Sequence, residues 1–468
     1  APPAGPGGPP APGAPAPPPP PPCVLETGME HVIGPYLAAH VRSRGRLVYT
    51  NNGTGGAFRG FGANQMTYAI ECQMDRLARQ VGLDPVEMRR RNLRGPEDRG
   101  YLGQMVAPSI YLNEMLDAAA SSPLWRNPRL PSQGDDTHLR GVGMGLIYQG
   151  NGLGTKFEDP LACRLRLAED GCIEAWCDLV EMGQGITAVV QSSMEQALGC
   201  AREDVRPVLG DTRINLDSGS TTASRGTIAA NIAIRGAAGM LAERLVAQAA
   251  MVLDCPPAML RPGRGGIHDV TRNADTQPLL TYTELARRAP DLSGLTVEFR
   301  GQVPTTLWKR ANARYLFCTG VVICQVAVER ATGVVTLEKA ELHCAAGPVI
   351  DVAGYLGQLE GGLMQGMGFT LMEHVPYGAG RPLALNFDGY MVPMMPDTPQ
   401  ALAIHAYEAM DSNDPAGVRG VGELGMAALT PAMANAVAAA TGMWPHAAPF
   451  RPEQIMRAIG TWIEEPRQ

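Results

Sequence analysis

A carboxylate held between glycines constrains this chain most, in the segment Gly420-Val421-Gly422-Glu423-Leu424-Gly425. The segment runs into a helix-forming stretch over residues 430–440, with Thr430 placed to cap it and Pro431 at its first helical position. A loop with three glycines before a helix does not favour a β-hairpin, and it lets the backbone approach a ligand closely. Glu423 is therefore the candidate catalytic base.

A second glycine-rich segment lies near the start of the chain. Residues 46–50 predict a short strand, which leads through the turn 51–56 and the stretch 57–65 to a helix over 66–81. A strand, a glycine loop and a helix start leave backbone N–H groups free to converge on an anion. An ordinary turn with no ligand is the alternative.

Two further segments combine glycines or hydroxyl side chains with a helix start. Residues 181–185 open a helix over 186–198, and Gln184 within them can both donate to and accept from a heterocycle or phosphate. Residues 221–227 precede the longest predicted helix, 228–253, and suit a pyrophosphate or pterin. A plain strand-to-helix turn and helix capping are the respective alternatives.

The remaining pattern predicts an α+β, multi-layer fold of two related units. Strands are expected at 139–148, 162–167, 172–180, 296–302, 317–328 and 334–344, and helices at 85–92, 110–120, 283–288, 352–367 and 452–463. Prolines and a glycine in the loop after residue 120 place a boundary between units 24–135 and 136–468. Within the helix 352–367, Gly361 and Gly362 suggest close backbone packing.

Composition excludes several other classes of protein. The first 22 residues comprise 13 Pro, 5 Ala and 4 Gly, so residues 1–23 are expected to be a disordered tail. A net charge of -7 argues against nucleic-acid binding, and the short tract 89–91 is expected to complement a helix dipole.

The polar residue types that bind metals or carry hydrolytic chemistry are not arranged in the usual motifs. Ten cysteines form no C-x-x-C pair and eight histidines no i,i+4 pair, so no metal bound by protein side chains is expected. Reduced cysteines in apolar runs fit a cytoplasmic protein, and no apolar run is long enough for a membrane span. G-x-S-x-G and Walker motifs are missing too.

Taken together, these segments resemble the molybdenum-binding subunit of the xanthine oxidase family of molybdenum hydroxylases. The resemblance rests on segments that keep the family's order between residues 24 and 463: 57–62, 181–185, 222–224, 358–366, and 422–423 before 431–436. It implies an enzyme that hydroxylates a carbon next to nitrogen or oxygen, with water as the oxygen source. The implied cofactor is molybdenum–molybdopterin, whose cytosine dinucleotide form is one alternative, and the metal is held by the pterin dithiolene.

The resemblance also implies roles for individual residues. Glu423 matches the glutamate that takes a proton from a molybdenum-bound hydroxyl, and Phe61 matches an aromatic residue that stacks on a flat substrate. Thr27 and Leu153 lie where relatives place other substrate contacts. The implied contacts to the cofactor are Arg59, Gly60, Gly183, Gln184, Gly185, Ala223, Ser224, Gly226 and Gln365.

Departures from the family leave substrate and assembly open. A glycine at position 60 disfavours copper-dependent carbon monoxide oxidation, and Thr27 replaces an arginine of xanthine-oxidising members. Family subunits carry several hundred further upstream residues, so we expect a second molybdopterin-subunit segment, a 2Fe-2S subunit and an FAD subunit in trans. Aldehydes, N-heterocycles and purines remain as substrates, and the alternatives are a non-catalytic scaffold, a xanthine dehydrogenase proper or an unrelated nucleotide- or sugar-binding module.

Overall fold

The structure is a computed structural model of the whole chain. It describes residues 23–48, 50, 56–108, 111–126, 137–213, 216–272, 277–289, 292–307, 312–409, 414 and 417–461. The proline-rich tail before Cys23 and most of the predicted turn 51–56 lie outside the described residues.

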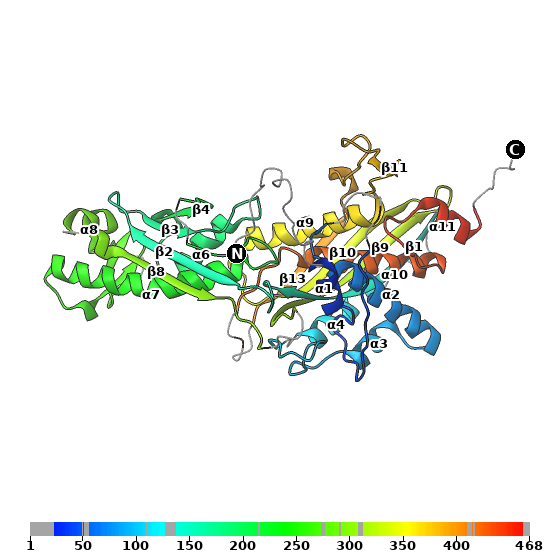
Figure 1. Cartoon of the computed structure of the whole chain (residues 1–468), viewed down its shortest axis with the longest axis horizontal. Coiled ribbons are helices and arrows are strands. Elements are labelled where there is room, and N and C mark those ends of the chain that lie inside the picture. The colour runs from blue at the N-terminus through cyan, green and yellow to red at the C-terminus, as the bar shows by residue number, and fades with distance from the viewer. Residues whose placement is uncertain are drawn as a thin grey trace, which may run out of the picture.

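A four-stranded sheet forms the centre of one half of the molecule (Figure 1). Its strand order is β1-β9-β10-β13, with β13 parallel to β10 and the other pairs antiparallel. The bounds are β1 His138–Asn151, β9 Leu316–Glu329, β10 Val335–Ala345 and β13 Ala401–Tyr407. Nearly every residue of β9 is buried, because helices cover both faces of the sheet.

The helices on the two faces come from opposite ends of the chain. One face packs on α9 and α10, with bounds Val352–Leu371 and Leu429–Thr441. The other face packs on the N-terminal helices. Their bounds are α2 Ala63–Val81, α3 Pro85–Asn92, α4 Leu112–Ser121 and α5 Pro123–Arg126. Residues before 127 therefore share a core with the sheet, and the division at 135/136 stays a prediction.

A second four-stranded sheet, of order β4-β3-β2-β8, lies at the other end of the molecule (Figure 1). Its strands are β2 Pro160–Leu167, β3 Ile173–Cys177, β4 Val205–Leu209 and β8 Thr296–Gln302. Helices α6 Ile186–Leu198 and α7 Gly226–Leu253 pack against it and form a separate apolar core. The small sheet β5-β6-β7 and α8 complete this end, with bounds Leu260–Gly263, Gly266–Asp269, Leu280–Thr281 and Tyr282–Arg288.

Most predicted elements form near their predicted bounds, but two local predictions are wrong. Residues 46–48 form no strand in the described part of that stretch. Helix α10 begins at Leu429, and the Thr430 hydroxyl contacts the Thr370 hydroxyl at 2.8 Å instead of capping the helix. Strand β13 and helix α1, Cys23–Glu30, were not predicted at all. Asp84 caps α3, since its carboxylate accepts from the Val86 N–H at 2.8 Å.

Arg89 lies in the last turn of α3 with Arg90 and Arg91, as the sequence predicted, but its contacts extend beyond this helix. Its side chain is fully buried and pairs with Glu71 and Asp75 of α2. It also donates to the backbone oxygen of Met144 in β1 at 3.2 Å. Because these partners lie on other elements, the arginine joins α3 to α2 and to the sheet.

Two helical stretches of the described residues are long and apolar enough to cross a bilayer by length and composition. They are Gly226–Leu253, with mean hydropathy 1.2, and Leu424–Thr441, with mean hydropathy 1.3. The second is 83% buried, and the inner face of the first packs in the core beside the second sheet. Core helices of globular proteins also have this length and composition, so the stretches are weak evidence for a span.

Candidate active site

A cavity of about 380 Å³ lies where the Glu423 loop meets the start of α7. Its walls come from Arg59, Gln184, residues 221–227, the first half of α9 and residues 419–423. These segments are far apart in the chain, and the fold brings the start of α7, one side of α9 and the Glu423 loop together. The volume falls in the range of small-molecule and cofactor sites.

Glu423 lies on the wall of this cavity and is half-buried. One carboxylate oxygen, Oε2, accepts from the Ser224 hydroxyl at 3.0 Å. The other, Oε1, accepts from the backbone N–H of Gly60 at 3.2 Å. Two donors from separate segments thus fix the orientation of the carboxylate, and an ionised carboxylate has further lone pairs for a ligand in the cavity.

The backbone at Ser224 adopts a conformation that few non-glycine residues take. Ala223 and Ser224 have φ of 51° and 50°, in the left-handed region. Asn151 at the end of β1 holds this turn, because its side-chain amide donates to the backbone oxygens of Ser224 at 3.2 Å and Gly420 at 2.8 Å. The same side chain therefore joins the Ser224 turn to the Glu423 loop.

Arg225 also holds this turn in place. Its guanidinium is fully buried and pairs with Asp159. It also donates to the backbone oxygens of Ser218 at 2.7 Å and Ser220 at 3.0 Å. The buried arginine thus ties the segment before α7 to the start of β2 and rigidifies the wall of the cavity.

Close backbone contacts explain the glycines around Glu423. A Cβ added at Gly420 would lie 2.1 Å from the backbone oxygen of Ser224. A Cβ added at Gly362 of α9 would lie 3.0 Å from the Cα atom of Gly425. The predicted close packing of the α9 glycines is confirmed at Gly362, whose partner is the Glu423 loop, but it is wrong at Gly361, where a Cβ would meet no described atom within 4 Å.

Arg59 reaches across the cavity to the loop and to α9. Its Nε donates to the backbone oxygen of Gly422, and one Nη donates to the backbone oxygen of Gln358 at 2.9 Å. The other Nη donates to the side-chain oxygen of Gln365 at 3.3 Å. Burial lowers the pKa of Arg59, and the charge of Glu423 opposes that shift. Gln365 therefore bonds to Arg59, and it is not among the described residues of the cavity wall.

Hydrogen bonds among its own residues hold the loop 181–185 beside the cavity. Glu181 accepts from the backbone N–H groups of Gly183 at 2.9 Å and Gly185 at 3.0 Å. The Gln184 side chain accepts from the Met182 N–H and donates to the Val180 backbone oxygen, both at 2.7 Å. Gln184 lines the cavity, but its amide is already bonded within its own loop. Among the described residues, the two glycines do not line the cavity wall.

The three predicted substrate contacts are not among the described residues that line this cavity. Thr27 is buried in α1, and its hydroxyl accepts from Arg314 at 3.3 Å. The Leu153 backbone bonds to Asp159 and Asn312. Phe61 follows Gly60 in the turn before α2, with φ of 51°. Of the described residues that form the cavity wall, none is Thr27, Phe61 or Leu153, and their assignment stays a prediction.

The donors around the cavity fit a phosphate-bearing cofactor. Helix α7 has 28 residues and opens on the cavity at Gly226 and Thr227. Among the described residues, no side chain caps this helix start, so its N–H groups are available to an anion. The small residues Ala223 and Gly226 leave room beside it.

Sequence reasoning missed the residues that hold the site together. Asn151, Arg225 and Arg419 are buried polar side chains whose partners lie in other segments, and Arg419 donates to the backbone oxygen of Phe317 at 3.0 Å. A local signal existed for Arg225 alone, as a charged residue directly before an apolar helix. Asn151 ends β1 and Arg419 lies in the loop before Glu423, and neither belongs to a recognisable motif.

Comparisons with known proteins agree with this geometry. Two profiles described as molybdopterin cofactor-binding domain match residues 13–93 and 118–399, and the second covers more than half of the chain. A probable xanthine dehydrogenase subunit of Bacillus subtilis is 39% identical over 93% of this chain and 57% of its own length. The aldehyde oxidoreductase of Megalodesulfovibrio gigas is 28% identical over 92% of this chain and 44% of its own.

A solved structure supports the same assignment. The aldehyde oxidoreductase from Desulfovibrio desulfuricans superposes with a TM-score of 0.76 and 26% identity, over 93% of this chain and 45% of that one. The chain thus spans about half the length of the relatives it matches. The predicted α+β molybdopterin-binding fold is confirmed, and the chain belongs to the molybdopterin cofactor-binding domain family.

Proposed function

We propose that this chain is the cofactor-binding part of a molybdenum hydroxylase that oxidises an aldehyde or N-heterocycle with water as the oxygen source. The observation that carries the proposal is the meeting of Glu423 and the uncapped start of α7 on one cavity. An anion site and a fixed carboxylate in one cavity suit a phosphate-bearing cofactor beside a proton acceptor.

Each wall of the cavity has its own part in this proposal. The start of α7, with Ala223 and Gly226, binds the phosphate of a molybdopterin, and its cytosine dinucleotide form is the variant we favour. Ser224 and the Gly60 N–H orient the Glu423 carboxylate, whose free oxygen lone pairs accept the proton of the attacking oxygen nucleophile. When bound, the pterin-held molybdenum supplies the two-electron redox centre.

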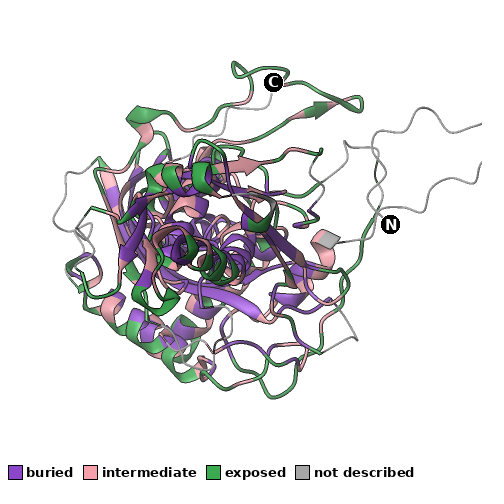
Figure 2. Ribbon diagram, turned by 90° about the vertical axis from the view of Figure 1, so that its left-hand side faces the viewer, coloured by how far each residue is buried: buried purple, intermediate pink, exposed green. Residues whose placement is uncertain are grey.

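Partners in trans complete the proposed enzyme. Residues 375–395 form an arm with the short strands β11 and β12, Tyr377–Gly378 and Arg381–Pro382, which projects from the molecule and is largely exposed (Figures 1 and 2). Leu385 is 81% exposed and Phe387 76%, which is unusual for such large apolar side chains.

We propose that the upstream molybdopterin-binding segment expected from the resemblance covers this arm, because its exposed large apolar side chains need a partner to bury them. A 2Fe-2S subunit and an FAD subunit then carry the electrons away. The relative from Bacillus subtilis is named as one subunit of a xanthine dehydrogenase, which supports separate electron-transfer subunits. The nine described free thiols support the proposed cytoplasmic location.

The proposal is tested with Glu423→Gln in the assembled enzyme. The amide keeps the size of the side chain but cannot accept the proton, so kcat should fall at least about 10²-fold. Molybdenum per chain should stay unchanged. The matched control is Glu360→Gln, on the exposed side of α9, which should keep full activity.

If Glu423→Gln turned over at the rate of the unmodified enzyme, Glu423 would not be the base. That result would favour the alternative of a non-catalytic scaffold. Turnover of an aldehyde and of an N-heterocycle in ¹⁸O-labelled water tests the reaction class separately. Label in the hydroxylated N-heterocycle supports hydroxylation by water, and unlabelled product contradicts it, whereas the aldehyde exchanges its own oxygen with water and tests turnover only.

A further inference from the structure

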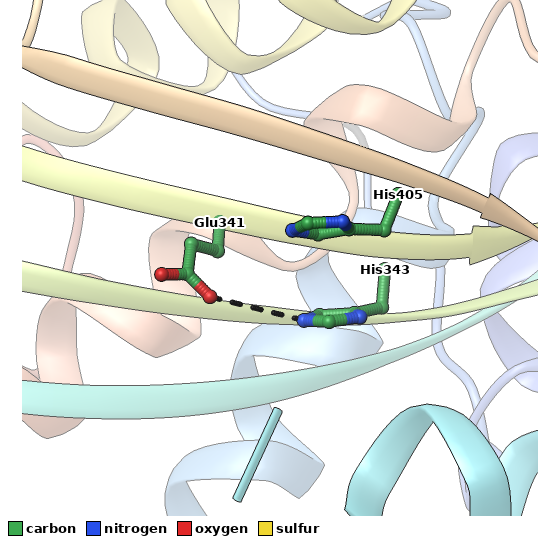
Figure 3. Close-up of side chains that lie close together, drawn as sticks. All are labelled: Glu341, His343 and His405. Atoms are coloured by element: carbon green, nitrogen blue, oxygen red, sulfur yellow. Dashed lines mark ion pairs between the residues drawn. The ribbon is translucent and has the colours of Figure 1, made fainter. Parts of the chain in front are cut away.

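A cluster of three metal-ligand side chains lies on the sheet β1-β9-β10-β13, away from the cavity. Glu341 and His343 project from β10, and His405 projects from the neighbouring edge strand β13 (Figure 3). His343 and His405 are register partners of the two parallel strands, and Glu341 stands two residues earlier on the same face. One ligand atom from each residue lies within 4.8 Å of the other two.

His343 is the member of the cluster that most needs a partner. Its side chain is 6% exposed, and its Nε2 atom finds no hydrogen-bond partner among the described residues. The closest approach of Nε2 to the Glu341 carboxylate is 3.9 Å, too long for a hydrogen bond. A buried ring nitrogen without a partner is costly, and a bound ion would satisfy it.

The ring of His343 is in the protonation state that binds metals. Burial and the adjacent His405 ring lower the pKa of His343 to about 4, so the imidazole is neutral near pH 7. Its other nitrogen, Nδ1, lies 3.4 Å from the Tyr407 hydroxyl. A proton on Nδ1 directed at that hydroxyl leaves the Nε2 lone pair facing the cluster.

The neighbours of the cluster also resemble the supporting shell of a metal site. Ser122 donates to one oxygen of Glu341 at 2.8 Å, which leaves the second oxygen directed toward His343. The two imidazole rings lie nearly parallel, 4.5 Å apart at 20°. His405 is exposed, so an ion can enter from solvent. Outer hydrogen bonds of this kind orient ligands and raise metal affinity.

We propose that Glu341, His343 and His405 bind a divalent transition metal ion, with Zn²⁺ preferred and water as the fourth ligand. Two imidazoles, one carboxylate and an open position form a ligand set that zinc adopts in proteins. Tetrahedral zinc places its ligand atoms about 3.4 Å apart, so binding would draw the present atoms closer and would turn the exposed His405 ring out of its stack on His343. The ion would tie the edge strand β13 to β10.

The site is separate from the proposed molybdenum cavity. Successive residues of a strand face opposite sides of its sheet, so Cys344 points away from His343. The Cys344 thiol lies 3.2 Å from the Tyr355 hydroxyl, and Tyr355 lines the cavity. Zinc binding and molybdenum loading can therefore be measured independently.

The test uses the full chain, purified with any subunits that accompany it and stripped of loosely bound metal with a chelator. Zn²⁺ is titrated by calorimetry, and Co²⁺ is used as a spectroscopic probe of a four-coordinate nitrogen and oxygen site. One saturable equivalent per chain is expected, without the sulfur-to-cobalt charge-transfer band that a cysteine site would give.

Three variants assign the site. His405→Ala removes an exposed ligand without disturbing the core and should weaken Zn²⁺ binding by at least about 100-fold, and Ser122→Ala by about 10- to 100-fold. His446→Ala, also at an exposed histidine, should bind as the unmodified chain does. Absence of saturable binding, a thiolate cobalt spectrum, or unchanged affinity in His405→Ala would each overturn the proposal.

Discussion

The Ser224 hydroxyl joins both ends of Glu423: it accepts from the Glu423 backbone N–H at 3.0 Å and donates to the Glu423 carboxylate at 3.0 Å. One hydroxyl thus sets both the position of the loop and the direction of the acid. Because Ser224 stands in a left-handed turn that Asn151 and Arg225 hold, the whole wall contributes to the placement of one carboxylate.

Ser224→Ala should lower kcat by about 10- to 100-fold, because a carboxylate that loses its orienting donor is misplaced for proton transfer. KM and molybdenum content should change little, since Ser224 acts through Glu423. Steady-state kinetics of the assembled enzyme check this. Ser121→Ala, at an exposed hydroxyl, is the control, and equal kcat values for the two variants would contradict the role.

Gly420→Ala should destabilise the protein by about 1–3 kcal/mol, because the new Cβ would overlap the Ser224 backbone oxygen. Gly239→Ala is the matched control, since a Cβ on that exposed helical residue meets no described atom within 4 Å. There alanine should stabilise the helix by about 0.5–1 kcal/mol. Denaturant unfolding should show a lower free energy of unfolding for Gly420→Ala and a higher one for Gly239→Ala. A Gly420→Ala variant as stable as the unmodified chain would disprove the close contact.

Arg89→Ala should lower the free energy of unfolding by about 3–5 kcal/mol, because it leaves the buried carboxylate of Glu71 without its partner. Arg91→Ala should change it by less than about 0.5 kcal/mol. Arg91 pairs with Glu87, but its side chain is 59% exposed. Urea denaturation measures the free energy of unfolding of the two variants. Similar losses in both would show that the buried Arg89 pair stabilises the protein no more than the exposed Arg91 pair.

The thiols of Cys318 and Cys344 should resist alkylation at pH 8. Burial raises the pKa of Cys318 to about 12 and that of Cys344 to about 11, so almost no reactive thiolate is present at that pH. The half-buried Cys255 should be labelled first. Mass spectrometry after iodoacetamide treatment checks the order, and denatured protein, in which all three should react, is the control.

Leu385→Asp with Phe387→Asp should prevent assembly with the upstream segment without lowering the stability of this chain. Both side chains are largely exposed here, so charges on them cost little until a partner must bury them. Leu307→Asp is the control, because Leu307 is 93% exposed on a separate loop. Size-exclusion chromatography of the co-expressed subunits shows whether the complex forms. Unchanged assembly of the double variant would show that the arm is not the docking surface.

Local sequence determined most of the helices and strands, because periodicity and caps act over a few residues. The Asp84 cap and the apolar strand β9 are examples. A glycine-rich loop indicated Glu423 as a site residue, and the small and hydroxyl residues before the longest helix indicated the segment with Ser224. The family resemblance then assigned both residues to one site.

Tertiary structure decided which distant side chains meet. Glu423 finds Ser224 and Gly60, Thr430 turns to another helix, and Arg89 is buried between α2 and β1. His343 and His405 become neighbours because β13 adds beside β10. Such contacts depend on the free energy of packing whole elements together, and a local pattern of residues holds no information about which partner it will meet.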